Sequence, residues 1–418
     1  MIRKKKDNKP ESVKPFSNRL IPLLAGVTAA IYSLSNPNPQ SGYDYTFRVA
    51  DRLLHGSVAI IKRPPPGLNE FVPFDGVYYS VFPLGAVLSM VPFALLRMLG
   101  IIREMPGGLI AALLAGCACF LLLRIASKYD LPPVRQILMT AGIVFGTFMW
   151  TNLTFAGAWQ LALGFAMVGE LGAIYFTVYD RRPLIAGVFF AMAFGNRTEN
   201  LLTAPVFLYL LARDERAAKT PGEKDPVATS DQIRRIAAFC AVPFVLGVAT
   251  LVYNYVRFHS FTDFGYARIP GVLNEPWYDH GIFSVTYIPR QAWEMLGKLW
   301  HWTDTFPYLI PDGFSNSILL SSPFLIFAAR FGSRDKMLKY SSWAAIIILT
   351  FLLWIHGNSG GWQFAYRYAM VLLPWIFVIL LESSPKRISP VEWGLYAISF
   401  AANAYATWLF NWTEYIKP

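Results

Sequence analysis

The chain has 418 residues, of which 55% are hydrophobic, 16% aromatic and 15% charged, with a formal net charge of +11. Soluble domains carry roughly a quarter charged residues, whereas the charges here lie in short clusters between long apolar stretches. This pattern excludes a soluble globular protein. It also argues against nucleic-acid binding, because no soluble segment has a basic face with interleaved aromatic residues.

The apolar stretches predict membrane-spanning helices, because a span needs about 20 mostly apolar residues. They lack the period-two alternation of barrel strands. In chain order the apolar runs cover about 19–35, 81–102, 106–126, 136–151, 158–179, 183–195, 199–212, 236–256, 316–331, 341–356, 367–382 and 392–410.

The distribution of Lys and Arg predicts the orientation of these runs. Most of the 37 Lys and Arg fall on the cytosolic side if the N-terminus is inside and the run 81–102 lies on, or dips into, the outer face. Pro83 and Pro92 support a run that does not cross, because proline removes backbone hydrogen bonds. The sequence therefore predicts an all-α polytopic membrane protein with about eleven transmembrane helices and outer surface helices in its first loop.

The predicted organisation has four parts. A basic cytosolic tail (1–18) precedes a transmembrane module (19–257) that contains a first outer loop (36–105). A second outer loop (258–315) and the C-terminal transmembrane helices (316–418) follow. Long loops held by a rigid scaffold are where functional residues gather, so the site is expected in the two outer loops.

The first outer loop begins with Asp44, followed by a segment in which Phe47, Val49, Ala50, Leu53 and Leu54 recur at helical spacing. This spacing predicts an amphipathic helix along the membrane surface. Asp44 has two interpretations. Its carboxylate either caps the helix N-terminus or faces a cleft as a catalytic base.

Further polar residues of this loop are candidates for substrate binding. Lys62 and Arg63 bind either anionic lipid headgroups or a substrate, and Glu70 and Tyr78 follow them. Asp75 and Gly76 between Glu70 and Tyr78 form a dipeptide that is typical of a turn.

Two arginines at the ends of apolar runs are the other candidates. Arg367, followed by Tyr368, lies at the outer mouth of a predicted span, and its planar fork suits a phosphate group. The alternative is an arginine that snorkels within an aromatic belt. Arg197 has the same two interpretations, with Glu199 as a possible structural partner.

Five segments resemble the GT-C membrane glycosyltransferases, which include protein O-mannosyltransferases and aminoarabinose transferases. They are Asp44 with 48–56, the Tyr-rich 74–85, 194–200, 281–284 with 313–323, and Gly360-Gly361-Trp362-Gln363-Phe364-Ala365-Tyr366-Arg367-Tyr368. The resemblance implies a GT-C-like helical bundle.

The resemblance also implies a function. It implies a polyprenyl-phosphate-sugar donor and a lipid, glycan or protein acceptor on the extracytoplasmic side of a plasma (inner) membrane, as in bacteria. Asp44 would be the base, and Arg367, aided by Arg197, would bind the donor phosphate. Asp44 is followed by Tyr45 and Thr46, so the first loop has no second acidic residue two positions after it. A divalent metal cofactor is possible, but no residue pattern indicates one.

Two rival classes remain open. A lipid or solute transporter or flippase would carry charges deep in the membrane and repeated halves, neither of which is visible in the sequence. A noncatalytic relative that binds a lipid or partner protein would keep the same scaffold without the chemistry.

Overall fold

The computed structural model describes residues 19–213 and 226–416. In the second of these ranges it describes the side chains from residue 230 onward. Helices dominate the N-terminal half, which also holds one two-stranded sheet. Its elements are α1 (Leu20–Leu34), α2 (Tyr45–Leu54), β1 (Phe71–Phe74), β2 (Val77–Ser80), α3 (Leu84–Met98), α4 (Gly107–Ala126), α5 (Pro133–Phe145), α6 (Met149–Phe155), α7 (Ala158–Ile174), the π-helix η1 (Tyr175–Tyr179), α8 (Pro183–Asn196), the 3-10 helix η2 (Thr198–Thr203), α9 (Ala204–Ala212) and α10 (Pro226–Phe258).

The C-terminal half has longer irregular stretches. After four short 3-10 turns (Tyr266–Arg268, Val272–Asn274, Pro276–Tyr278 and Val285–Tyr287) come α11 (Ile288–Leu296), β3 (His301–Trp302), β4 (Leu309–Ile310), α12 (Ile318–Ser321), the 3-10 helix η7 (Pro323–Ala329), α13 (Lys336–Ile355), the 3-10 helix η8 (Arg367–Leu372), α14 (Leu373–Ser383) and α15 (Pro390–Trp412).

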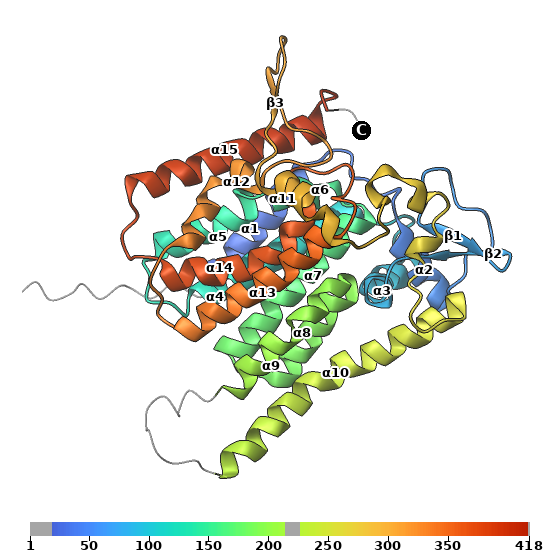
Figure 1. Ribbon diagram of the computed structural model, residues 1–418, viewed down its shortest axis with the longest axis horizontal. Helices are drawn as coiled ribbons and strands as arrows, with labels where there is room; N and C mark the ends of the chain where they lie inside the picture. Colours follow the sequence, from blue (N-terminus) through green and yellow to red (C-terminus); the bar gives the residue numbers. More distant parts are fainter. Residues whose placement is uncertain (1–18, 214–225, 417–418) are drawn as a thin grey trace, which may run out of the picture.

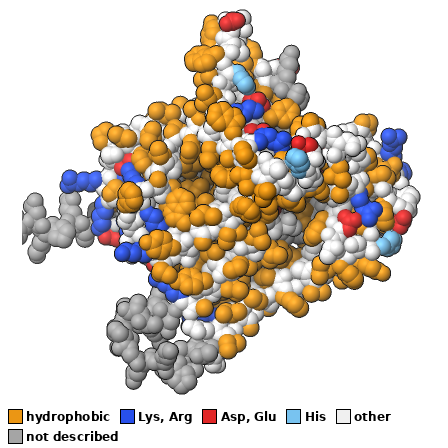
Figure 2. Space-filling model, viewed as in Figure 1, with side chains coloured by type: hydrophobic (Ala, Val, Ile, Leu, Met, Phe, Trp, Pro, Cys, Tyr) orange, Lys and Arg blue, Asp and Glu red, His pale blue; other side chains and the backbone are white. Residues whose placement is uncertain are grey.

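The helices form one bundle with the first loop attached at one side. In Figure 1, α1, α4, α5, α7, α13 and α14 form the centre, and α15 lies along one edge. Helix α10 packs on α8 and α9 and extends away from the centre, while α2, α3 and the β1–β2 hairpin lie together on the right. Hydrophobic side chains cover most of the face shown in Figure 2.

Four helical segments of the described chain are long and apolar enough to cross a membrane: 107–126, 158–179, 230–258 and 336–355. A fifth span results if α5 and α6, bent by 47° against each other, count as one. These segments support the prediction of a helical membrane protein. They do not confirm the predicted number of eleven spans.

Several predicted runs are not continuous α-helices: the runs 199–212 and 367–382 begin with the 3-10 helices η2 and η8, and the run 158–179 ends in the π-helix η1. The run 136–151 is broken where α5 ends at Phe145, and the run 316–331 forms the four-residue α12 and the 3-10 helix η7. Pro323 begins η7 and cannot continue the hydrogen-bond ladder of α12. The predicted polar interruption at 196–200 is present, because Arg197 has extended backbone angles between α8 and η2.

The first loop follows the prediction closely. Helix α2 buries Phe47, Val49 and Ala50 and turns its charged face outward. The Asp75–Gly76 turn joins β1 and β2, with positive φ at both residues (49° and 77°). Helix α3 has 15 residues and is about 22 Å long, which is shorter than a hydrocarbon core of about 30 Å. Its position relative to a bilayer stays a prediction.

Helices α3 and α8 meet at two glycines, and this contact brings the first loop against the bundle. A Cβ atom on Gly85 would lie 2.4 Å from the backbone of Gly195, so only glycine allows the approach. Gly195 directly precedes Asn196 and Arg197, so the contact sets the position of those side chains relative to the first loop.

Candidate functional site

One large cavity, of about 1220 Å³, lies where the first loop meets the bundle. Its wall comes from the segment before α2, the ends of the β1–β2 hairpin, the start of α7, the α8–η2 junction, the loop 262–267, the end of α13 and the segment 356–368. Ligand pockets for small molecules measure roughly 300–1,000 Å³, so this cavity has room for a larger ligand.

Arg367 is one of the two arginines of the described chain that line this cavity. It is 6% exposed, and its Nη1 donates to the carbonyl of Gly361 at 2.8 Å. Its Nη2 lies 3.4 Å from the Tyr368 hydroxyl. Its buried Nε has no hydrogen-bond partner among the described residues. A buried donor without a partner carries a desolvation cost that a bound anion would relieve.

Arg197 lies beside the same tyrosine. The Arg197 guanidinium is centred 4.7 Å from the Tyr368 ring centroid, and that of Arg367 is 5.2 Å from it. Arg197 Nη2 also forms an ion pair of 2.6 Å with Glu199, as the sequence suggested. Two guanidinium groups therefore lie close to one aromatic ring in the cavity wall.

Glu70 is the carboxylate of the first loop that lines the cavity. It directly precedes β1, and the indole N–H of Trp159 donates to its Oε1 at 2.9 Å. Burial raises the pKa of Glu70, while the neighbouring Tyr45 hydroxyl, the Trp159 N–H and the Arg367 charge lower it by less. A carboxylate with a raised pKa is suited to proton transfer near neutral pH.

Asp44 lies beside the cavity without being one of its lining residues in the described chain, although its neighbour Tyr43 is one. It is the N-cap residue of α2, but its side chain makes no capping hydrogen bond, so that interpretation is wrong. Its carboxylate instead accepts from Arg48 Nε at 2.5 Å. Burial raises the pKa of Asp44, and Arg48 lowers it by less.

Three further candidates lie outside the cavity wall, as far as the described chain forms it. Lys62 and Arg63 are exposed on the loop that precedes β1. The half-buried Tyr78 in β2 pairs its backbone with Ile60. The structure thus brings Glu70, Arg197, Glu199, Arg367 and Tyr368 together and leaves these three apart from them.

Several cavity residues were not predicted from the sequence. Gln160 and Asn196 are 1% and 3% exposed, and each has an amide oxygen without a partner among the described residues. The sequence feature that could have indicated them is a polar residue within or directly beside an apolar run. His356 also lines the cavity. Burial lowers its pKa, which favours the neutral imidazole.

Part of the wall is apolar. Val81, Phe82, Phe264, Leu352 and Leu353 line the cavity beside its charged groups. A cavity whose wall is partly charged and partly apolar suits an amphiphilic ligand with a polar head and an apolar tail. No group of three or more His, Cys, Asp and Glu side chains in residues 19–213 and 226–416 is arranged to hold a metal ion, so the structure gives no site for the divalent metal that the sequence left possible.

The chain is similar to a solved structure but matches no family model and no curated protein. Among solved structures, the chain is similar to the apo form of the Archaeoglobus fulgidus oligosaccharyltransferase, with 12% identity and a TM-score of 0.43. The match covers 94% of this chain and 55% of that protein, so the chain spans about half its length. At this score the likeness does not establish a shared fold.

Proposed function

We propose that the protein is a membrane glycosyltransferase that moves a sugar from a polyprenyl-phosphate donor to a lipid, glycan or protein acceptor. The observation that carries the proposal is the single cavity that holds Glu70, Arg197 and Arg367 beside an apolar wall. The charged part would hold the phosphate and sugar, and the apolar part would hold the first isoprene units. The family resemblance of the sequence supports the same chemistry.

The proposed reaction is a single displacement. The oxygen of the acceptor hydroxyl forms a bond to the anomeric carbon of the sugar, while Glu70 takes the proton of that hydroxyl. The bond from that carbon to the phosphate oxygen breaks, and its electron pair leaves with the polyprenyl phosphate. Arg367 and Arg197 stabilise the charge that develops on the phosphate. Inversion at the anomeric carbon follows from one displacement.

Asp44, the base that the sequence suggests, is the second candidate for the proton acceptor. One oxygen of its carboxylate is occupied by the ion pair with Arg48, and Asp44 is not among the described residues that line the cavity. Glu70 has no such pair at ion-pair distance in the described chain, and it lines the cavity directly. We therefore assign the base to Glu70 and a positioning role at the start of α2 to Asp44.

The site would lie on the extracytoplasmic side of a plasma membrane. The first loop and the segment 356–368 contribute to the cavity, and the distribution of Lys and Arg supports that side for both. A bacterial inner membrane is the setting that the family resemblance implies.

A transporter or flippase, or a noncatalytic lipid-binding relative, would use the same cavity without breaking a bond. Incubation of the purified protein with a panel of synthetic polyprenyl-phosphate sugars and membrane acceptors distinguishes these classes by mass spectrometry. The proposal expects free polyprenyl phosphate and a glycosylated acceptor from one donor of the panel. Tight binding of a donor that stays intact with every acceptor would support the rival classes.

A further inference from the structure

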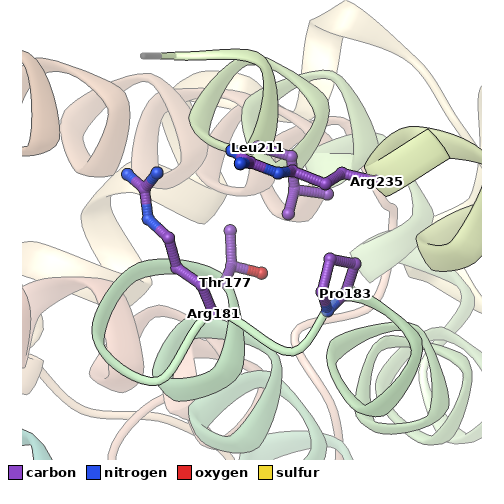
Figure 3. A pocket seen from close by; sticks show the side chains of 5 residues that line it. All are labelled: Thr177, Arg181, Pro183, Leu211 and Arg235. Atoms are coloured by element: carbon purple, nitrogen blue, oxygen red, sulfur yellow. The ribbon is translucent and has the colours of Figure 1, made fainter. Parts of the chain in front are cut away.

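A second, smaller hollow lies at the other end of α7 from the large cavity. Its volume is about 100 Å³. Figure 3 shows the side chains that line it, which are Thr177, Arg181, Pro183, Leu211 and Arg235. Helix α7 begins beside the large cavity and has 17 residues before η1, so the two sites are about 25 Å apart along its axis. The small hollow lies among the loops that are predicted to be cytosolic.

Thr177 is a buried polar side chain of this hollow that has no hydrogen-bond partner among the described residues. Its side chain is 1% exposed, and its Oγ1 has no hydrogen-bond partner in the part of the chain that the structure describes. It belongs to the π-helical turn η1, and such turns are frequent at functional sites. A buried hydroxyl without a partner costs free energy, and a bound ligand with acceptor oxygens would remove that cost.

Two arginines from different elements lie beside Thr177. Arg181 follows η1, and Arg235 comes from α10; their side chains extend along the hollow in Figure 3. Arg235 has no ion-pair partner among the described carboxylates. The acidic groups nearest in sequence are Asp180, which pairs with Arg182 at 3.3 Å, and the exposed Asp231 one turn earlier on α10.

The N-terminus of α8 completes the hollow. Pro183 is its first residue and lines the space directly. The first N–H groups of a helix have no partner within the helix and carry a partial positive charge, so they attract anions. Guanidinium groups, a free hydroxyl and a helix N-terminus are the donors that bind phosphate in proteins.

We propose that this hollow binds a phosphate group at the cytosolic end of the molecule, independently of the sugar-transfer site. Two sources supply this chemistry: the headgroup of an anionic phospholipid in the inner leaflet and a soluble phosphate compound. The position at the end of α7, with Leu211 in the wall, places the group at the level of lipid headgroups. Binding there would tie η1, α8 and α10 together.

The test uses the full chain in detergent with two probes, inorganic phosphate and a short-chain phosphatidylglycerol, and with diacylglycerol as the phosphate-free control. Binding is followed by native mass spectrometry and by the midpoint of thermal unfolding. The variants are Arg235→Gln and Thr177→Val. Arg234→Gln is the matched control, because Arg234 is exposed, carries the same charge and does not line the hollow in the described chain.

Arg235→Gln should weaken binding of the phosphate probe by about tenfold or more, as expected for loss of a charge-assisted hydrogen bond. Thr177→Val should weaken it several-fold, and Arg234→Gln should leave it unchanged. Binding of both probes identifies a general phosphate site, and binding of phosphatidylglycerol alone identifies a lipid site. Absence of binding by the unaltered protein, or equal losses in the Arg234 and Arg235 variants, would overturn the proposal.

Discussion

The indole N–H of Trp159 donates a hydrogen bond of 2.9 Å to Oε1 of Glu70, and so joins the start of α7 to the first loop. This bond fixes one oxygen of the carboxylate in the cavity wall. The Tyr45 hydroxyl lies beside the same carboxylate and also lowers its pKa. The position of Glu70 thus depends on a residue 89 positions away in the sequence.

Replacement of the proposed base should abolish most transfer. Glu70→Gln keeps the shape of the side chain and its contact with Trp159 but cannot accept a proton, so we expect kcat to fall by about 10²–10⁴-fold. Asp44→Asn should lower it much less, because Asp44 pairs with Arg48. Rates of product formation by the purified variants decide between the two carboxylates, and the reverse order of effects would return the role of base to Asp44.

The pH dependence of transfer should report Glu70. A base works only when ionised, so log(kcat/KM) should rise with pH through the Glu70 pKa, which burial holds above the ordinary value of about 4.3. The raised pKa also means that the folded state binds this proton more tightly, so its ionisation destabilises the fold as pH rises. Glu70→Gln should therefore unfold at no lower temperature than the unaltered protein at pH 7. A profile without this acidic limb would contradict the assignment.

Arg367 should act on the donor more than on the acceptor. Arg367→Ala removes the guanidinium that is expected to meet the phosphate, so the KM for the donor should rise by about tenfold or more, with a smaller change for the acceptor. Arg367→Lys should restore part of the loss, since it keeps the charge without the planar fork. Steady-state kinetics with each substrate varied in turn gives both values. A selective rise in the acceptor KM would count against the phosphate role.

The glycine contact between α3 and α8 should tolerate no side chain. Gly85→Ala forces a Cβ atom into the backbone of Gly195, and overpacking of this kind costs about 1–3 kcal/mol. Gly247→Ala on α10 is the control, because, outside its own stretch of helix, no atom of residues 19–213 or 226–416 lies within 4 Å of the Cβ it would add. Thermal unfolding in detergent should show a lower midpoint for Gly85→Ala alone, and equal midpoints would show that the helices separate at no cost.

A buried ion pair should stabilise the opposite end of the bundle. Arg135 on α5 and Glu392 on α15 are each 1% exposed in their side chains and lie 2.7 Å apart, and Arg330 joins Glu392 at 2.8 Å. Arg135→Ala leaves a buried carboxylate with one partner fewer, so we expect a loss of about 3–5 kcal/mol. Arg387→Ala, which removes an exposed neighbouring charge, should cost little. Denaturant unfolding compares the two, and similar losses would mean that the pair contributes nothing specific.

Local patterns predicted the parts of this structure that depend on nearby residues. The helical spacing from Phe47 to Leu54 gave α2, and the Asp75–Gly76 dipeptide gave the hairpin turn. Arg197 and Glu199, two positions apart, form the predicted pair. Each of these depends on local backbone geometry and side-chain type, which the sequence records directly.

Contacts between distant segments could not be predicted in the same way. Trp159 and Gln160 look like ordinary members of an apolar run until α7 is packed against the first loop. The sequence likewise does not show which carboxylate the packing turns toward the cavity, and in the described chain Glu70 lines it whereas Asp44 does not. The bend between α5 and α6 lies at Gly146, but an isolated glycine in an apolar run does not by itself predict a break, and the sequence run 136–151 was expected to be one helix.

The proposed mechanism is tested most directly by a structure of the Glu70→Gln variant with an intact polyprenyl-phosphate sugar bound. We expect the phosphate at Arg367 and Arg197, the anomeric carbon turned toward position 70, and the isoprene chain along Phe82 and Leu353. A donor whose phosphate binds away from both arginines, or whose sugar lies out of reach of position 70, would contradict this mechanism.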